Sequence, residues 1–326
     1  MAGEAPLYIS SCRIKELVSM KDVIGAMQDA LRWFSEGGQV VQPVRTVVSI
    51  EQHCGFLASM PALCSPAQGL GVKLVTFYSR NFEKNLPSHH AIVILFEPST
   101  GAIKALLDGE TITTMRTAAV SACAVKVLAR NPPKVLAIVG CGVQARSHAQ
   151  ALCVVHQYSE VRVWGRSYEK AVQCASDIGE FARPYPSLCD TVKDADVIVT
   201  VTMATEPVLH GEWLKPGAVV CCVGACRPSW READDDVMQN AVVFVDSREA
   251  ALKESGDIVL SGAKVFAEIG EVLAGKVHVP LIPECGKKFA VFKSLGLAVE
   301  DVVTGELIYQ RHSELLREQH QKSQHD

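Results

Sequence analysis

The sequence has no long run of Lys or Arg, and its formal net charge is -4. Because nucleic acids and anionic membranes attract clustered positive charge, neither is an expected partner. No uninterrupted apolar stretch approaches the roughly 20 residues that a membrane-spanning helix needs. The first residues also lack the basic and then apolar pattern of a secretory signal. We therefore expect a cytoplasmic protein whose partners are small molecules.

Internal repeats are absent too, and the one biased segment is a polar tail after Leu316, which we expect to be frayed. The 12 cysteines are scattered, and Cys221 and Cys222 stand in an apolar run, so we expect reduced thiols instead of a disulfide framework. The 326 residues exceed the usual size of one compact core, and 48% of them are hydrophobic. A two-domain α/β enzyme is the expected class.

The first third of the chain has the pattern of one amphipathic helix followed by consecutive strands. Apolar residues recur at helical spacing in residues 19–38, with Ser19 as the N-cap and Gly37-Gly38 as the stop. Short β-rich runs separated by turn residues follow, and together they predict an antiparallel or mixed sheet. These runs lie at residues 44–50, 55–60, 72–78, 91–96 and 102–107.

Strands and helices alternate after an Ala-rich helical stretch at residues 113–130, which Asn131-Pro132-Pro133 ends. Helices should begin near Val143 and Ser167, and the Val- and Ile-rich runs are typical of parallel strands that are covered on both faces. We expect these strands at residues 135–139, 161–164, 197–201, 218–223 and 242–245.

The pattern predicts an α/β fold with two domains. Residues 118–295 form a Rossmann-type dinucleotide-binding domain. The last helical segment, residues 296–317, is long enough to return to the first domain. We therefore assign residues 1–117 and 296–326 to a smaller α+β domain, which we expect to serve substrate binding and dimerisation.

A glycine motif directly follows the first predicted Rossmann strand. The residues from Gly140 to Ala145 read G-x-G-x-x-A and open a helix. The first Gly permits a tight turn, Gly142 lets backbone N–H groups approach a pyrophosphate, and Ala145 lets helix and strand pack closely. A glycine turn that binds nothing is the weaker interpretation, because the motif stands between a strand and a helix.

The choice between NAD and NADP is normally made at the end of the second Rossmann strand. An acidic residue there would bind the ribose hydroxyl of NAD, but this chain has Gly165-Arg166-Ser167. A guanidinium and a hydroxyl suit a 2′-phosphate, so we expect NADP(H). A solvated surface cation is the alternative for Arg166. Thr202 and Val223, at the ends of later strands, should line the nicotinamide side.

Three cations of the first domain stand in largely apolar surroundings: Arg45, Lys73 and Arg116. Buried cations need anions. Acidic residues nearby in the sequence could pair with them, and for each cation alone that interpretation is about as good as a substrate role.

Ten segments between about Gln42 and Asp301 resemble signature segments of the ornithine cyclodeaminase/mu-crystallin family, and most closely its mu-crystallin, or ketimine reductase, branch. They read QPVRT, KLVTFY, PSHHA, LFEPSTG, MRTAAVSA, GCGVQA, ATEPVL, VGACRPSWRE, ALKESGD and VFKSLGLAVED.

The resemblance implies roles for individual residues. Arg45 and Arg116 would bind the α-carboxylate of the substrate, and Ala225 and Glu254 would lie at the substrate pocket. Lys73 would either donate a hydrogen bond to that carboxylate or lie beside the reacting nitrogen. His89 alone would more often be structural, and no metal is expected. The implied NADP(H)-binding residues are Ser88, His89, Arg116, Gly140, Cys141, Gly142, Val143, Gln144, Gly165, Arg166, Ser167, Thr202, Met203, Val223 and Ser294.

One departure from the family bears on the reaction. Cyclodeaminases carry an acid/base Asp where this chain has Cys226. A cysteine beside an apolar strand is more often inert packing, so cyclodeamination is disfavoured.

The resemblance implies NADPH-dependent reduction of the C=N bond of cyclic ketimine carboxylates with piperideine, pyrroline or thiomorpholine-type rings. It also implies thyroid-hormone binding in the same pocket, and a homodimer. The alternatives are a hormone carrier or lens crystallin with little catalysis, and an amino-acid dehydrogenase that uses ammonia and a keto acid.

Overall fold

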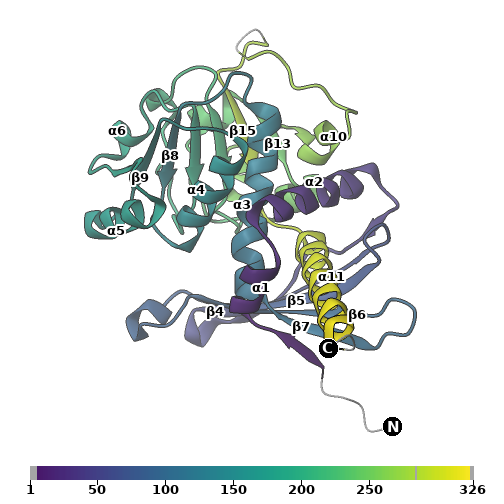
Figure 1. The fold of residues 1–326 in the computed structure, drawn as a ribbon. Helices are drawn as coiled ribbons and strands as arrows, with labels where there is room; N and C mark the ends of the chain where they lie inside the picture. The colour runs from purple at the N-terminus through teal and green to yellow at the C-terminus, as the bar shows by residue number, and fades with distance from the viewer. Residues whose placement is uncertain (1–5, 283–284, 324–326) are drawn as a thin grey trace. The chain divides into compact units, whose positions relative to one another are not determined.

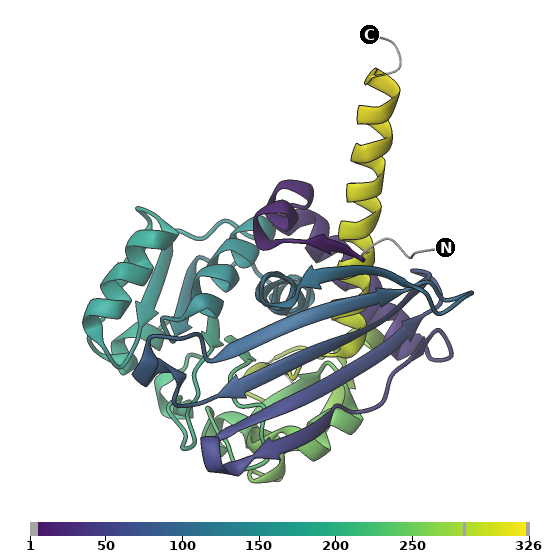
Figure 2. The same cartoon turned by 90° about the horizontal axis from the view of Figure 1, so that it is seen from below.

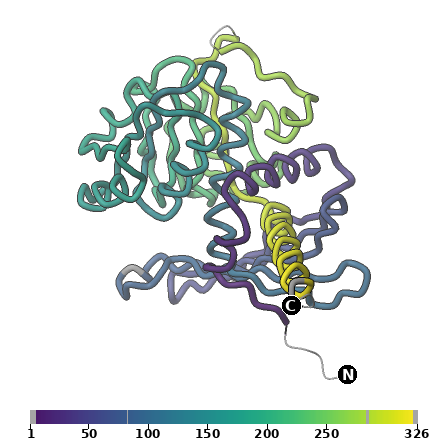
Figure 3. The backbone as a smooth tube through the Cα atoms, in the orientation of Figure 1, coloured from purple at the N-terminus to yellow at the C-terminus, as the bar shows by residue number. Residues whose placement is uncertain are grey.

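A computed structural model describes residues 6–282 and 285–323 of the chain. The chain divides into two compact units, Met1–Arg116 with Leu297–Asp326, and Thr117–Gly296. The backbone passes between them twice, once within helix α3 (Gly109–Leu128) and once after Gly296 (Figure 3). Each unit is described by itself below, with the element labels of Figure 1.

The first unit contains a seven-stranded sheet with the order β1-β7-β6-β5-β4-β2, in which β3 also pairs with β4. All described pairs are antiparallel except β1 with β7, which confirms the expected mixed sheet. The strands are β1 (Leu7–Ile9), β2 (Val40–Val41), β3 (Thr46–Ile50), β4 (Gly55–Cys64), β5 (Gly69–Tyr78), β6 (His89–Phe96) and β7 (Ile103–Asp108).

Helices α1 (Ser11–Leu17) and α2 (Met20–Glu36) precede most of this sheet in the chain. Ser19 and Asp22 form a capping box at the start of α2, and Gly37 ends the helix with a positive φ of 81°, so the expected helix is confirmed.

Helix α11 (Ala298–Ser323) packs against α2 and against strands β4, β5 and β6 (Figure 2). Its apolar face is buried, including Val299, Val302 and Ile308. The expected fraying after Leu316 is wrong, because the helix continues to Ser323. The residues of this tail are polar, but Arg, Glu, Gln and Lys are good helix formers and no Gly or Pro interrupts them.

The second unit is built on an eight-stranded sheet in which every described pair is parallel, with the order β10-β9-β8-β11-β12-β15-β13-β14. This confirms the Rossmann-type fold. The strands are β8 (Val135–Val139), β9 (Glu160–Trp164), β10 (Ala182–Pro184), β11 (Val197–Thr200), β12 (Val219–Cys222), β13 (Ala241–Val245), β14 (Val265–Glu268) and β15 (Phe289–Lys293).

Helices connect these strands, as crossovers between parallel neighbours require. The central strands β11, β12, β13 and β15 are buried along their whole length, which explains their near-continuous apolar sequence. Within the described residues, no helix is both long and apolar enough to cross a membrane. The helices of this unit are α4 (Val143–Val155), α5 (Tyr168–Ile178), α6 (Leu188–Val192), α7 (Asp235–Gln239), α8 (Arg248–Glu254), α9 (Gly256–Val259) and α10 (Ile269–Leu273).

Candidate active site

Two of the three predicted cations of the first unit converge on one buried carboxylate. The Nζ atom of Lys73 lies 2.6 Å from Oδ2 of Asp301. Nε of Arg116 donates to Oδ1 of the same residue at 3.0 Å, and Nη1 of Arg116 donates to Oε2 of Glu300 at 2.7 Å. All four side chains are buried. The cations are therefore paired, but their partners come from α11 and not from acidic residues nearby in the sequence.

Close packing of α11 on strand β5 brings these partners to the cations. A Cβ atom on Gly69 would lie 2.8 Å from Cγ1 of Val302, and one on Gly71 would lie 3.1 Å from Cγ2 of the same residue. The two glycines thus let the helix approach the strand that carries Lys73. The first turn of α11 is fixed further by Gln42, whose Oε1 accepts a hydrogen bond from the backbone N–H of Val299 at 2.8 Å.

The surroundings of Lys73 change its affinity for a proton. Burial, and after it the charges of Arg116 and Arg45, lower the pKa of its ammonium; Asp301 raises it, and the net pKa is about 8. The effect of Arg45 places that residue within electrostatic reach of Lys73. Burial also lowers the pKa of Arg116, but the carboxylates of Asp301 and Glu300 outweigh that effect and raise it.

Ser88 and His89, also of the first unit, lie together where β6 begins. Oγ of Ser88 is 2.9 Å from Nδ1 of His89, and the imidazole lies 4.9 Å from the ring of Phe77 between centroids. Part of the imidazole is exposed, but the protein packed around it, and then the charge of Lys73, lower its pKa to about 4. The ring is therefore neutral near pH 7.

In the second unit, the glycine loop has the geometry that a pyrophosphate requires. Gly140 has a φ of 123°, and its Cβ would lie 2.8 Å from the carbonyl oxygen of Val201, so only glycine fits. Gly142 is the N-cap of α4, and the side of its backbone where a Cβ would project is open. Ala145 is fully buried against the strand. The first turn of α4, with Val143 and Gln144, therefore offers N–H groups to an anion.

The loop after β9 lies against the glycine loop. A Cβ atom on Gly165 would lie 2.5 Å from Sγ of Cys141, so glycine is needed for this approach. Arg166 is exposed. The hydroxyl of Ser167 caps α5, where it accepts from the N–H of Lys170 at 3.3 Å and donates to Glu169 at 2.8 Å. Arg166 is thus the more accessible of the two groups expected to meet a 2′-phosphate.

The remaining residues predicted for this unit follow the carboxyl ends of parallel strands, or lie on α8. Thr202 and the exposed Met203 follow β11, Val223 and the buried Ala225 follow β12, and Ser294 follows β15. Glu254 is the last residue of α8. Ligands of open parallel sheets lie at this edge, so the strand-end residues occupy positions that suit a dinucleotide.

The sequence patterns missed a buried charge network at the same edge. Glu232, Asp257 and Lys293 are fully buried, and Nζ of Lys293 lies 3.1 Å from Oδ2 of Asp257. Lys293 alone carried a signal in the sequence, as a single charged residue inside the apolar run FAVFKSLG; Glu232 and Asp257 stand among other charged residues. Asp301 and Glu300 were also missed, although they form a charged pair inside the apolar run GLAVEDVV.

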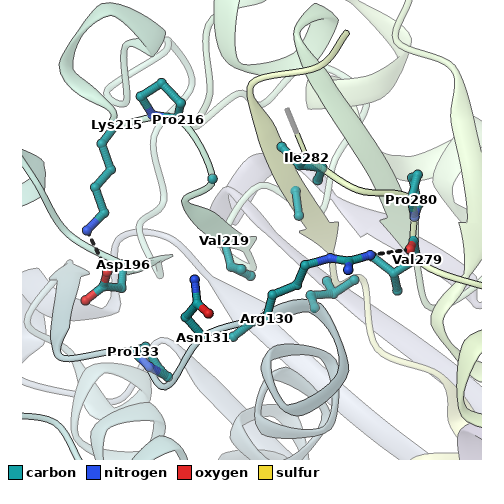
Figure 4. Close-up of a pocket in the computed structure, with 14 residues that line it drawn as sticks. Arg130, Asn131, Pro133, Asp196, Lys215, Pro216, Val219, Val279, Pro280 and Ile282 are labelled. Carbon is teal, nitrogen blue, oxygen red and sulfur yellow. Dashed lines mark hydrogen bonds and ion pairs between the residues drawn. The ribbon is translucent and has the colours of Figure 1, made fainter. Parts of the chain in front are cut away.

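A cavity of about 370 Å³ lies at the opposite, amino edge of this sheet (Figure 4). Its charged side chains are engaged within the unit. Arg130 donates to the carbonyl oxygen of Val279 at 2.7 Å, and Lys215 lies 2.5 Å from Asp196. Because the glycine loop follows the carboxyl end of β8, this cavity is not the dinucleotide site.

Comparisons with known proteins bear on this arrangement. The model of the ornithine cyclodeaminase/mu-crystallin family matches residues 6–315. The ketimine reductase mu-crystallin of Rattus norvegicus is 50% identical over 308 residues, which cover 94% of this chain and 97% of that protein. The Delta(1)-pyrroline-2-carboxylate reductase of Bacillus cereus is 34% identical over 317 residues, with 94% and 96% covered.

A solved structure of a reductase also matches this chain over nearly its whole length. Thermococcus litoralis Delta(1)-pyrroline-2-carboxylate reductase, in complex with NADH and L-proline, matches with a TM-score of 0.90 at 34% identity and covers 94% of this chain and 98% of that chain. Both the family model and the relatives span nearly the whole sequence. The chain therefore belongs to the ornithine cyclodeaminase/mu-crystallin family.

Proposed function

We propose that the protein reduces the C=N bond of cyclic ketimine carboxylates to cyclic amino acids, with NADPH as the hydride donor. The coarse class, an imine-reducing oxidoreductase, has the support of relatives that are ketimine and pyrroline-2-carboxylate reductases. The observation that carries the proposal is the buried cluster of Lys73, Arg116, Glu300 and Asp301, with Arg45 in electrostatic reach.

Arg45 and Arg116 bind the substrate carboxylate in this mechanism. The two ion pairs of Arg116 use two of the five N–H donors of its guanidinium, and bidentate binding of a carboxylate needs two more. Because the carboxylate is attached to the imine carbon, holding it also fixes the position of the C=N bond.

Lys73 supplies the proton for the imine nitrogen. An ammonium with a pKa of about 8 is protonated at pH 7 and yet gives up its proton more readily than an ordinary lysine. The bound nucleotide supplies the hydride, which adds to the imine carbon. The product is a cyclic amino acid such as pipecolate or proline.

The preference for NADPH over NADH rests on this chain's own residues. The exposed Arg166 follows the second Rossmann strand, where an NAD-specific site would have an acidic residue. The residues proposed to hold the nucleotide are Ser88, His89, Arg116, Gly140, Cys141, Gly142, Val143, Gln144, Gly165, Arg166, Ser167, Thr202, Met203, Val223 and Ser294. Ala225 and Glu254 are proposed to contact the substrate.

The purified protein provides the test, through the loss of NADPH absorbance with piperideine-2-carboxylate, pyrroline-2-carboxylate and a thiomorpholine-type ketimine. The proposal expects turnover without ammonia and a higher kcat/KM with NADPH than with NADH. A requirement for ammonia and a keto acid would instead identify an amino-acid dehydrogenase, and absence of turnover with every ketimine would refute the proposal.

We also propose that a thyroid hormone binds at the same cations, because an iodothyronine carries an amino-acid head group. The hormone should then act as a competitive inhibitor against the ketimine. Noncompetitive inhibition would rule out a shared site.

A homodimer is proposed through the first unit. Its strand β3 exposes Val48, and Leu57 of β4, which is paired with Val48 and lies on the same face of the sheet, is 38% exposed. Adjacent exposed apolar side chains are typical of interaction surfaces. Light scattering should give twice the mass of the chain for the native protein, and a lower mass for Val48→Glu.

A further inference from the structure

The carboxylate of Glu232 ties together two backbone segments of the second unit that follow neighbouring strands. Its Oε1 accepts hydrogen bonds from the N–H and the hydroxyl of Thr202, at 2.6 and 2.7 Å. Its Oε2 accepts from the hydroxyl of Thr200 at 2.8 Å and from the N–H groups of Gly224 and Ala225, at 2.7 and 3.3 Å. One buried side chain therefore satisfies five donors on the two segments.

The two segments are in direct contact beside this carboxylate. A side chain on Gly224 would overlap the carbonyl oxygen of Thr202, and its Cβ would lie 2.6 Å from Oε1 of Glu232. Glycine is therefore needed where the segment after β12 meets the segment after β11. Any movement of the Glu232 carboxylate would move both segments together.

Glu232 is itself held in place by a second buried carboxylate. Oδ1 of Asp257 accepts hydrogen bonds from the N–H groups of Glu232 and Ala233, at 2.8 and 3.1 Å. Oδ2 of Asp257 is 3.1 Å from Nζ of Lys293, at the end of β15. The network thus runs from β15 through α9 to Glu232 and is buried throughout. Such an arrangement fixes the carboxylate instead of leaving it free to change conformation.

The two segments held by Glu232 follow β11 and β12, the next two strands of the sheet beside the strand leading into the glycine loop. Strand β8, which leads into the glycine loop, is paired with β11, and β11 is paired with β12. In a sheet of this order the pyrophosphate lies at the glycine loop and the nicotinamide half extends over the strands on the far side from β9. The segments held by Glu232 follow those strands.

We propose that Glu232 is a positioning residue that fixes the backbone after β11 and β12 in the conformation that orients the nicotinamide for hydride transfer. This inference rests on the proposed function, since it assigns the residue to the reductase reaction. Glu232 acts through Thr202, Gly224 and Ala225, and it is distinct from the cations proposed to bind the substrate.

The test compares Glu232→Gln with the wild type and with Glu249→Gln. Glu249 is an exposed residue of α8 whose described partner is Lys253 on the same helix, so it is a matched control. Dissociation constants are measured for NADPH and for adenosine 2′,5′-bisphosphate, which lacks the nicotinamide half. Hydride transfer is followed in single turnovers with NADPH and with NADPH deuterated at the transferred position.

For Glu232→Gln we expect weaker NADPH binding, unchanged binding of the adenosine fragment, and hydride transfer slower by about 10²-fold, the cost of misplacing reacting groups by about 1 Å. The deuterium isotope effect on steady-state turnover should rise, because hydride transfer becomes more rate-limiting. A merely structural role would weaken both ligands together. Hydride transfer within about twofold of the wild type would overturn the proposal.

Thr200→Val provides a second variant should Glu232→Gln fail to fold. It removes one of the five donors and preserves a β-branched side chain in the strand. We expect the same signature with a smaller magnitude, and an unchanged rate and isotope effect would refute the inference. A wild type that binds NADPH but reduces no ketimine would refute the proposed function alone, because the ratio of the two dissociation constants would still report on Glu232.

Discussion

Lys73 of β5 and Asp301 of α11 form a buried ion pair, with 2.6 Å between Nζ and Oδ2. The same carboxylate binds Arg116 through its other oxygen. Breaking a buried pair leaves an uncompensated charge, so each member constrains the others. The cluster therefore has to be tested through changes in pH dependence and substrate affinity as well as through loss of activity.

Replacement of Lys73 by Met should remove the proton donor and keep most of the side-chain volume. We expect kcat to fall by at least about 10²-fold, the usual contribution of general acid catalysis. In the wild type, kcat/KM should be constant below pH 8 and fall above it, since the protonated amine is the active form and its pKa is about 8. Lys73→Met should lose this decline, and full turnover with an unchanged pH profile would show that Lys73 is not the acid.

Replacement of Asp301 by Asn should shift the same pH profile. Asp301 raises the pKa of Lys73 against burial and against the charges of Arg116 and Arg45, so its removal lowers that pKa below about 8. The decline of kcat/KM should therefore begin at a lower pH. The lost pair should also cost about 3–5 kcal/mol of stability, measured by urea unfolding. Lower stability with an unchanged pH profile would restrict Asp301 to a structural role.

Arg45→Ala should weaken binding of the ketimine without affecting the nucleotide. Loss of a charged hydrogen bond costs about 1.5–3 kcal/mol, which corresponds to an increase of about 10- to 10²-fold in substrate KM. Titration of NADPH fluorescence serves as the control, because binding of the nucleotide should remain close to that of the wild type. Equal losses for both ligands would indicate misfolding.

Arg166→Ala should weaken the binding of NADPH and leave the binding of NADH almost unchanged. If the guanidinium binds the 2′-phosphate, its removal should raise the dissociation constant of NADPH by about tenfold or more, as loss of a charge-assisted bond does. NADH lacks this phosphate, so its binding should hardly change and provides an internal control. A similar change for both nucleotides would show that Arg166 does not choose between them.

The cations and the glycine motif could be predicted from local sequence, but their partners could not. Lys73 and Arg116 stand out as charges within apolar runs, and Gly140 to Ala145 carry their own strand and helix context. The pairing of Asp301 with both cations depends on α11 docking onto β5, which no local pattern encodes. Strand β15 was overlooked for a similar reason, since a short apolar run does not reveal that it inserts between β12 and β13.

The docking of α11 can be tested at Gly71. A Cβ atom there would lie 2.8 Å from the carbonyl oxygen of Ile94 and 3.1 Å from both Leu95 and Val302. Gly71→Ala should thus cost about 1–3 kcal/mol in overpacking, and it should raise substrate KM because α11 carries Asp301.

Gly25→Ala is the matched control in the interior of α2, where a Cβ would meet nothing within 4 Å. Alanine is the better helix former by about 0.8–1 kcal/mol, so this variant should be slightly more stable than the wild type and equally active. Urea unfolding and ketimine kinetics measure both variants. A Gly71→Ala protein as stable and active as the Gly25→Ala protein would mean that the helix can yield at this contact without displacing Asp301.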